Sequence, residues 1–160
     1  MNANLIVADY SNSKHAEDIV YLLNQYALDS AGGGTELSSY AKENLTVELA
    51  KLPFAFSILC YVDNAHAGLV NCFTLFSTFK CKPLINIHDL AVIKQYRRQG
   101  ISQRLRNEVE KVARDKDACK ITLEVLEKNI AARKSYAKFG FVGYELDPNY
   151  GNAIFLEKAL

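Results

Sequence analysis

The residues with the clearest capacity for chemistry form one short turn, Arg97-Arg98-Gln99-Gly100-Ile101-Ser102. The turn joins an apolar, strand-like run, Ile85 to Ile93, to an amphipathic helical run that begins at Ile101. The first backbone N–H groups of a helix have no partner within the helix and carry the positive end of its dipole, so they bind phosphate oxygens. Gly100 lets the backbone approach such a ligand closely. The turn therefore predicts an anion site.

Five basic residues lie within or beside this turn: Lys94, Arg97, Arg98, Arg104 and Arg106. Such a cluster suggests a ligand with several phosphate charges. The alternative is a solvated helix end, where charged residues commonly gather. The whole chain carries a net charge of only +1. Nucleic-acid binding is therefore disfavoured, and the basic residues suit a smaller phosphate ligand better.

The elements before the turn follow from hydrophobic periodicity. The run Leu5–Ala8 predicts a strand, and helical spacing predicts a first helix after an N-cap at Ser13 and a second helix over Leu37–Leu52. Two runs rich in aromatic and β-branched residues, Phe54–Val62 and Gly68–Phe76, flank a turn-like segment and predict a β-hairpin. The run Ile85 to Ile93 adds a strand that leads into the turn.

The elements after the turn begin with a helix whose apolar face carries Ile101, Leu105, Val109, Val112 and Ala113. Alternation over 121–125 predicts a strand, and 129–140 predicts a helix. Two short runs, 143–146 and 153–156, predict a closing hairpin. We expect an α/β fold of the mixed α+β kind, with a mixed central sheet of about seven strands and helices on both faces.

Length and composition set the class of protein. A chain of 160 residues, 49% of them hydrophobic, predicts a single domain over residues 1–160 with its own core. The four cysteines have no CxxC spacing and no histidine cluster nearby, which argues against a metal site or a disulfide framework. No run reaches the roughly 20 apolar residues of a membrane span, and no signal-peptide pattern is present. We expect a cytoplasmic protein without a membrane partner.

Two separated motifs resemble those of the Gcn5-related N-acetyltransferases, the GNAT family. The first is Arg97-x-x-Gly100-x-Ser102 after Leu90-Ala91-Val92, although Ser102 stands where the family usually has Gly or Ala. The second is Asn129-x-x-Ala132-x-x-x-Tyr136-x-x-x-Gly140-Phe141. The segments 76–79 and 87–90 are similar to the diamine and polyamine acetyltransferase branch, which usually carries Glu-Asp at the position of His88-Asp89.

The resemblance implies that acetyl-coenzyme A is the acyl donor, with no metal. It places the pantetheine arm beside Leu90, Ala91 and Val92, the oxyanion donor at the backbone N–H of Leu90, and the pyrophosphate at the turn. Asn129 would bond the pantetheine amide, cap the last helix, or do both, and Arg133 would reach a phosphate or remain an exposed helix charge. The implied cofactor-binding residues are therefore Leu90, Ala91, Val92, Arg97, Arg98, Gln99, Gly100, Ile101, Ser102, Asn129 and Arg133.

The resemblance also suggests catalytic and acceptor-binding residues. Tyr136 would protonate the leaving thiolate, because a phenol with a pKa near 10 is close enough to a thiol near 8.5; periodicity alone makes it a packed aromatic residue. His88 would take the amine proton, since an imidazole titrates near neutral pH, but a core histidine is the alternative, with Asp89 or water as the base. Asp89 and Glu124 would bind the acceptor, although an ordinary strand carboxylate fits Glu124 as well.

We therefore expect an acetyl-coenzyme A-dependent N-acetyltransferase that acts on a primary amine of a small molecule by direct attack in a ternary complex. The alternatives are a non-enzymatic acyl-coenzyme A binding or sensing module and a protein or peptide N-acetyltransferase. A homodimer is compatible with the sequence. The identity of the amine, and whether longer acyl groups are accepted, are left open.

Overall fold

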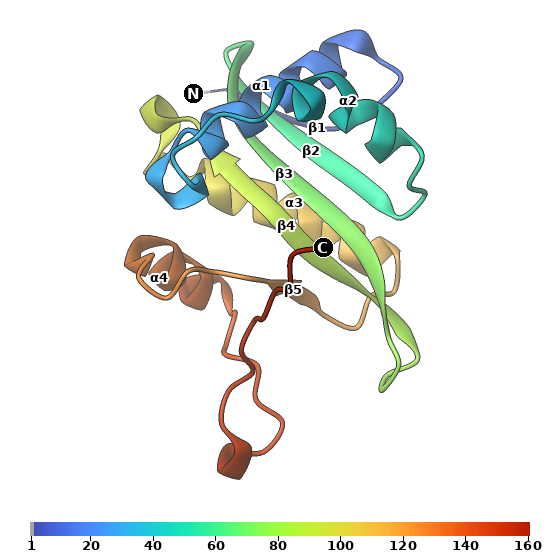
Figure 1. Cartoon of the computed structure of the whole chain (residues 1–160), viewed down its shortest axis with the longest axis vertical. Coiled ribbons are helices and arrows are strands. Elements are labelled where there is room, and N and C mark those ends of the chain that lie inside the picture. The colour runs from blue at the N-terminus through green and yellow to red at the C-terminus, as the bar shows by residue number, and fades with distance from the viewer. Residues whose placement is uncertain (1) are drawn as a thin grey trace. The chain divides into compact units, whose positions relative to one another are not determined.

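A computed structural model describes residues 2–160 and divides the chain into two compact units. The first unit runs to Leu123 and holds a sheet with three long helices, and the second is Glu124–Leu160 with one helix (Figure 1). The turn that predicts an anion site and the paired residues His88 and Asp89 both lie in the first unit. Tyr136 lies in the second unit.

The sheet of the first unit has five strands in the order β1-β2-β3-β4-β5. The strands are β1 (Ala3–Val7), β2 (Ala55–Val62), β3 (Ala65–Ser77), β4 (Lys82–Val92) and β5 (Ile121–Leu123). All neighbours are antiparallel except β4 and β5, which run parallel. The β2–β3 connection is a two-residue turn in which Asp63 and Asn64 both have positive φ, the conformation that matches the twist of a hairpin.

Helices cover both faces of this sheet. α1 (Ser13–Ala27) and α2 (Ser39–Ala50) lie on one face, and α3 (Ile101–Asp115) lies on the other (Figure 1). On the α3 side, a Cβ at Gly68 would come within 3.2 Å of the Ile101 side chain and within 2.8 Å of the Ala91 carbonyl oxygen. The absence of a side chain at Gly68 thus lets α3 approach β3 closely.

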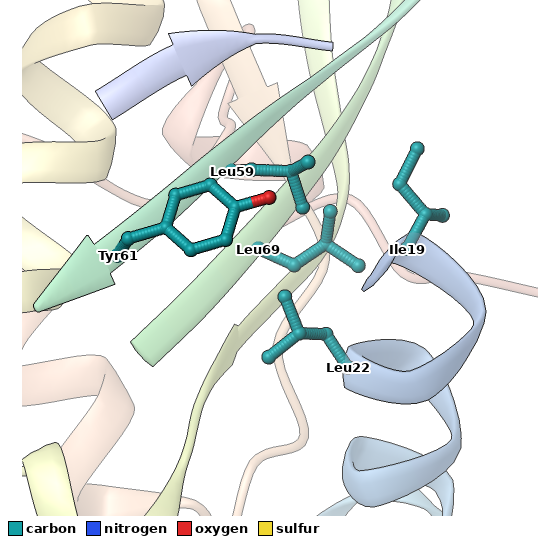
Figure 2. Packing of buried hydrophobic residues seen from close by; sticks show 5 residues of the cluster. All are labelled: Ile19, Leu22, Leu59, Tyr61 and Leu69. Carbon is teal, nitrogen blue, oxygen red and sulfur yellow. The ribbon is translucent and has the colours of Figure 1, made fainter. Parts of the chain in front are cut away.

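The core on the α1 side joins the first helix to the two central strands. Ile19 and Leu22 of α1 pack against Leu59, Tyr61 and Leu69, and all of these side chains are buried (Figure 2). Full burial of one such aliphatic side chain stabilises a fold by roughly 2 kcal/mol. This cluster fixes α1, and with it the segment that follows α1, over the middle of the sheet.

A β-bulge interrupts the pairing of β3 with β4. Asn71 pairs with Asp89, but the next residue on β3, Cys72, pairs with Ile87. His88 is therefore the extra residue on β4. A bulge changes the alternation of side chains along its strand, so it decides which face His88 and Asp89 share.

The second unit contains α4 (Ile130–Phe139) and a short 3₁₀ turn, Pro148–Tyr150. Asn129 caps α4 through a bond from the Ala132 N–H, and Gly140 ends the helix with φ +104°. Rings of Tyr136 and Phe141 meet edge to face at 5.9 Å between centroids. Beyond α4, an isolated bridge joins Glu145 to Asn152.

The predicted fold class is confirmed, with helices on both faces of a mixed sheet. The predicted number of about seven strands is wrong, because the sheet has five strands; of the run 143–146 only Glu145 forms a bridge, with Asn152 just before the run 153–156. Two short runs around a turn do not suffice for strands, since an isolated hairpin is marginally stable and a strand needs a paired neighbour. The predicted N-cap at Ser13 is also wrong, because the Asn12 side chain accepts from the N–H groups of Lys14 and His15.

Candidate functional site

The start of α3 differs from the start of the other three α-helices. Asn12, Ser38 and Asn129 cap α1, α2 and α4 through side-chain oxygens. At α3 the N-cap is Gly100, which has φ +81° and no side chain to offer, and no side chain among the described residues caps this helix. The first N–H groups of α3 are thus left for another acceptor, which is the arrangement that binds phosphate.

The side chains of the turn stabilise its own backbone. The Arg97 guanidinium donates to the Val92 carbonyl oxygen at 3.0 Å and to Asp29 Oδ2 at 2.7 Å. The Gln99 amide donates to the Gln95 carbonyl oxygen at 2.7 Å. The bond from Arg97, together with one from the Ala31 N–H, holds the pKa of the Asp29 carboxyl below its ordinary value. Arg97 and Gln99 therefore shape the turn, and main-chain amides are the groups it presents.

The C-terminal half of β4 has an open edge. β5 ends at Leu123, which pairs with Ile87, so β4 extends beyond it. The N–H of Ile93 bonds the Ala67 carbonyl oxygen on the β3 side at 3.0 Å. Because N–H groups alternate between the two sides of a strand, those of Leu90 and Val92 point away from β3 toward the open edge. An extended ligand can pair with such an edge as another strand does.

The bulge directs His88 and Asp89 to one face of the sheet. Asp89 Oδ2 accepts from the Asn71 side-chain amide at 3.0 Å, and the His88 ring meets Phe73 edge to face at 5.3 Å. Asn71 and Phe73 are two residues apart on β3 and share the face of Leu69, which packs against α1. The imidazole of His88 is exposed, so it does not belong to the core.

A series of hydrogen-bonded polar side chains runs across neighbouring strands of the sheet and ends at Asp89. Ser57 Oγ donates to Asn71 Oδ1 at 2.7 Å, and the Tyr10 hydroxyl lies 2.9 Å from Ser57 Oγ. Ser57 is fully buried and Asn71 is 4% exposed. Burial raises the pKa of the Tyr10 phenol, which keeps it protonated as a donor. Sequence analysis missed this chain, although a Ser and an Asn inside apolar strand runs were a usable signal.

The second unit holds the other predicted site residues. Tyr136 is half-buried in α4 and packs against Phe141. Asn129 has the capping role described above, which leaves its amide nitrogen for a further bond. The Arg133 guanidinium donates to the Glu127 carbonyl oxygen at 3.1 Å. Glu124 is exposed and lies outside β5, so its predicted place in a strand is wrong; the strand ends at Leu123.

A second polar cluster lies between α1 and the β2–β3 hairpin. The Asp18 carboxylate is 4% exposed and accepts from the Tyr61 hydroxyl, from Lys14 Nζ at 3.1 Å and from His66 at 2.7 Å. Burial opposes the charge, but these hydrogen bonds outweigh it and lower the pKa of Asp18 below its ordinary value. His66 is half-buried here.

The sequence also raised metal ligands, cysteine thiols, Arg106 and membrane-spanning helices, and the structure bears on each of them. Among residues 2–160, no group of three or more His, Cys, Asp or Glu side chains could hold a metal ion. Cys60 and Cys72 are buried thiols, and burial raises the pKa of both. Arg106, grouped with the basic cluster by sequence, is 3% exposed inside α3. Within the same residues, no helix has the length and apolar character needed to cross a membrane.

The sequence matches the family described as Acetyltransferase (GNAT) family over residues 19–141. This range covers the turn at Gly100, the bulge in β4 and the motif around Tyr136. No curated protein matches the chain by sequence.

Solved structures share the fold at low sequence identity. One is an aminoglycoside acetyltransferase, meta-AAC0020, from an uncultured soil metagenomic sample in complex with trehalose: TM-score 0.79, 16% identity, 99% of this chain and 96% of that chain covered. A ribosomal-protein-alanine N-acetyltransferase from Brucella melitensis biovar Abortus 2308 has TM-score 0.75 at 16% identity, with 91% and 96% covered. AAC(6')-Iy in complex with a bisubstrate analog, CoA-S-monomethyl-acetylneamine, has TM-score 0.77 at 16% identity, with both chains fully covered.

The fold, the uncapped start of α3 beside an open strand edge, and the sequence match together define an acyl-transferring enzyme. The chain belongs to the acetyltransferase (GNAT) family. The predicted class, an acetyl-CoA-dependent N-acetyltransferase, is thereby confirmed. The similarity to the diamine and polyamine branch stays a prediction.

Proposed function

We propose that this enzyme transfers an acetyl group from acetyl-coenzyme A to a primary amine of a small, cationic molecule. The observation that carries the proposal is the combination, along one strand, of a backbone anion site and open edge at one end with a carboxylate and an imidazole at the bulge. The family match spans both compact units, which supports residues 1–160 as one N-acyltransferase domain. The homodimer and the cytoplasmic location stay predictions.

Acetyl-coenzyme A would be held mainly by main-chain groups. The amides of Ile101 and Ser102 at the start of α3 suit its pyrophosphate. The outward N–H groups of Leu90 and Val92, with the C=O of Leu90, suit the amides of its pantetheine arm. Exposed Arg98 adds positive charge close by. The donor supplies an activated thioester, and the N–H of Leu90 is the group we assign to the negative charge that develops on its carbonyl oxygen.

Transfer requires a neutral amine and a proton for the leaving thiolate. His88, exposed at the bulge, takes a proton from the acceptor ammonium, and Asp89 binds the ammonium before it loses that proton. The amine nitrogen then attacks the thioester carbon, a C–N bond forms as the C–S bond breaks, and the proton that the nitrogen still has to lose goes to solvent, which returns one to the Tyr136 phenolate. Tyr136 donates its phenolic proton to the thiolate, a role supported by its place in the second family motif.

The charge around the bulge favours a cationic acceptor. No Lys, Arg or His among the described residues forms an ion pair with Asp89. The negative charges of Asp89 and Asp29 both act on Tyr26 of α1, whose pKa is raised first by burial and then by these carboxylates. Rings of Phe54, Phe73 and His88 follow one another beside this charge, at 6.2 Å and 5.3 Å between centroids. A site with the Asp89 carboxylate and these aromatic faces suits an ammonium group.

The test is release of the coenzyme A thiol from acetyl-coenzyme A in the presence of three acceptors: an aminoglycoside (sisomicin), a diamine (1,4-diaminobutane) and a peptide with a free alanine N-terminus. We expect release with a small cationic amine and little with the peptide. Release with the peptide alone would instead identify a protein N-acetyltransferase. Binding of acetyl-coenzyme A without release for any amine would favour the non-enzymatic binding module.

A further inference from the structure

The polar chain behind Asp89 has a single direction of donation. The hydroxyl of Ser57 has one proton, and it is directed to Asn71 Oδ1. The bond between Tyr10 and Ser57 must therefore be donated by Tyr10. Asn71 receives through its oxygen and donates through its nitrogen to Asp89 Oδ2 at 3.0 Å. Every donor in the chain thus faces Asp89, and bonds aligned in this way polarise one another.

We propose that Asn71, backed by Ser57 and Tyr10, is a positioning residue that fixes the Asp89 carboxylate for the cationic acceptor. The proposal rests on the proposed function. The chain crosses three strands and ends on the one carboxylate of the bulge. A carboxylate accepts up to about four hydrogen bonds, so the bond from Asn71 leaves most of this capacity for an ammonium.

The chain orients Asp89 and does not conduct protons to it. A side-chain amide does not readily pass on a proton that its oxygen receives, so Asn71 interrupts any proton path from Ser57 to Asp89. Orientation matters at this point because the bulge leaves a strand without its regular pairing, and an unrestrained Asp side chain there would lose rotamer entropy when it binds an amine. The buried Asn71 amide restricts the Asp89 side chain before the amine binds, so less rotamer entropy is lost on binding.

Three substitutions each remove one hydrogen-bond donor from the series Tyr10–Ser57–Asn71, at positions successively closer to Asp89. We expect the KM for the acceptor amine to rise about twofold in Tyr10→Phe, about threefold in Ser57→Ala and about tenfold in Asn71→Leu, because each removes a donor closer to the carboxylate. The KM for acetyl-coenzyme A should stay within about twofold of wild type in all three. Ser57→Thr, which keeps the hydroxyl, should restore the wild-type amine KM.

Asn86→Leu provides the matched control. Asn86 is a second asparagine on these strands, 7% exposed, and its amide nitrogen donates to the Thr122 hydroxyl on β5 at 3.2 Å. The control should lower the melting temperature as Asn71→Leu does, with an unchanged amine KM. Equal amine KM values in wild type and all three chain variants, with only the melting temperature lowered, would overturn the proposal.

A readout without turnover separates this proposal from the proposed function. In a ¹⁵N–¹H spectrum, the side-chain amide proton of Asn71 should shift upfield in Tyr10→Phe, because the loss of one bond weakens the next. An unshifted signal would overturn the polarised chain. The Asn71 amide signal could shift as expected while wild-type enzyme acetylates no amine. In that case the proposed function is wrong, and so is the role of Asn71 in acceptor binding.

Discussion

At its C-terminal end β4 runs into a turn whose proposed ligand-binding groups are main-chain amides, whereas the groups proposed to bind the acceptor near its middle are the side chains of His88 and Asp89. The first region needs only an open edge and a residue that tolerates positive φ at position 100. The second needs particular side chains, held by Asn71 and Phe73. A backbone site can therefore serve one donor across many sequences, while a side-chain site can differ from chain to chain. Substitutions in the turn should change the affinity for acetyl-coenzyme A, whereas substitutions at the bulge should change the reaction with the amine.

The largest effect is expected for the proposed proton donor in the second unit. Tyr136→Phe should lower kcat roughly 100-fold and leave the KM for acetyl-coenzyme A nearly unchanged, because it removes the hydroxyl and keeps the ring that packs against Phe141. Steady-state kinetics measures both values. Tyr150→Phe is the control, since Tyr150 is 90% exposed and should tolerate the change. A wild-type kcat in the Tyr136 variant would make this tyrosine a packing residue only.

The backbone region is tested by a charge at the start of α3. Gly100→Asp should raise the Kd of acetyl-coenzyme A about 50-fold, because a carboxylate would stand at the N-terminus that receives phosphate. Gly100→Asn has the same shape and the same tolerance of positive φ, so it reports the cost of the side chain alone; we expect less than about fivefold. Calorimetry of donor binding measures both. Equal affinities for the Asp and Asn variants would refute a phosphate site at this turn.

The bulge is tested through the pH dependence of the rate. At subsaturating amine the rate should rise over the range in which imidazoles lose their proton, about pH 6 to 8, and His88→Ala should remove this rise and lower the rate about tenfold at neutral pH. His15→Ala is the control, because the His15 ring lies in the first turn of α1, where it accepts from the Asp9 N–H, and not on β4. Persistence of the rise without His88 would transfer the role to Asp89 or to water.

The smallest effect on catalysis is expected for the Asp18 cluster, because the partners of Asp18 are Lys14, Tyr61 and His66 and none of them belongs to β4. Asp18→Asn should lower the free energy of unfolding by about 2 kcal/mol at neutral pH, with kcat and both KM values unchanged. Because folding lowers the pKa of Asp18, its contribution is present above the unfolded pKa of about 4 and is lost as pH falls through the folded value.

Urea unfolding of both proteins from pH 7 down to pH 2 measures this loss. The difference in free energy of unfolding between wild type and Asp18→Asn should fall toward zero as the pH falls. Lys14→Ala removes only the exposed partner of Asp18 and should change stability by less than about 0.5 kcal/mol. A gap that is constant with pH would show that the charge of Asp18 does not contribute.

Local patterns predicted the parts of the fold that depend on nearby residues. The apolar face of α3 appears as expected, with Ile101, Leu105 and Val109 buried, because helical periodicity reports burial directly. The hairpin of β2 and β3 also follows from its strand propensities and its turn. The uncapped helix start after Gly100 was visible for the same reason, since a glycine at an N-cap leaves its amides open.

Features that depend on pairing between distant residues could not be predicted. The shared face of His88 and Asp89 is set by the register of β3 against β4, where a one-residue shift reverses every side chain. Two of the partners of Asp18, Tyr61 and His66, are likewise distant from it in sequence, so this cluster could not be predicted. The expected closing hairpin of 143–146 and 153–156 is wrong, because a turn signal does not show whether the flanking runs will pair as strands.

The most direct test of the account is a crystal structure of the enzyme with bound coenzyme A. We predict that the pyrophosphate oxygens accept from the N–H groups of Ile101 and Ser102, and that the pantetheine amides bond Leu90 and Val92 along the open edge of β4. Coenzyme A held elsewhere, or held at the turn only by side chains, would contradict the division of β4 into a backbone-built donor site and a side-chain-built acceptor site.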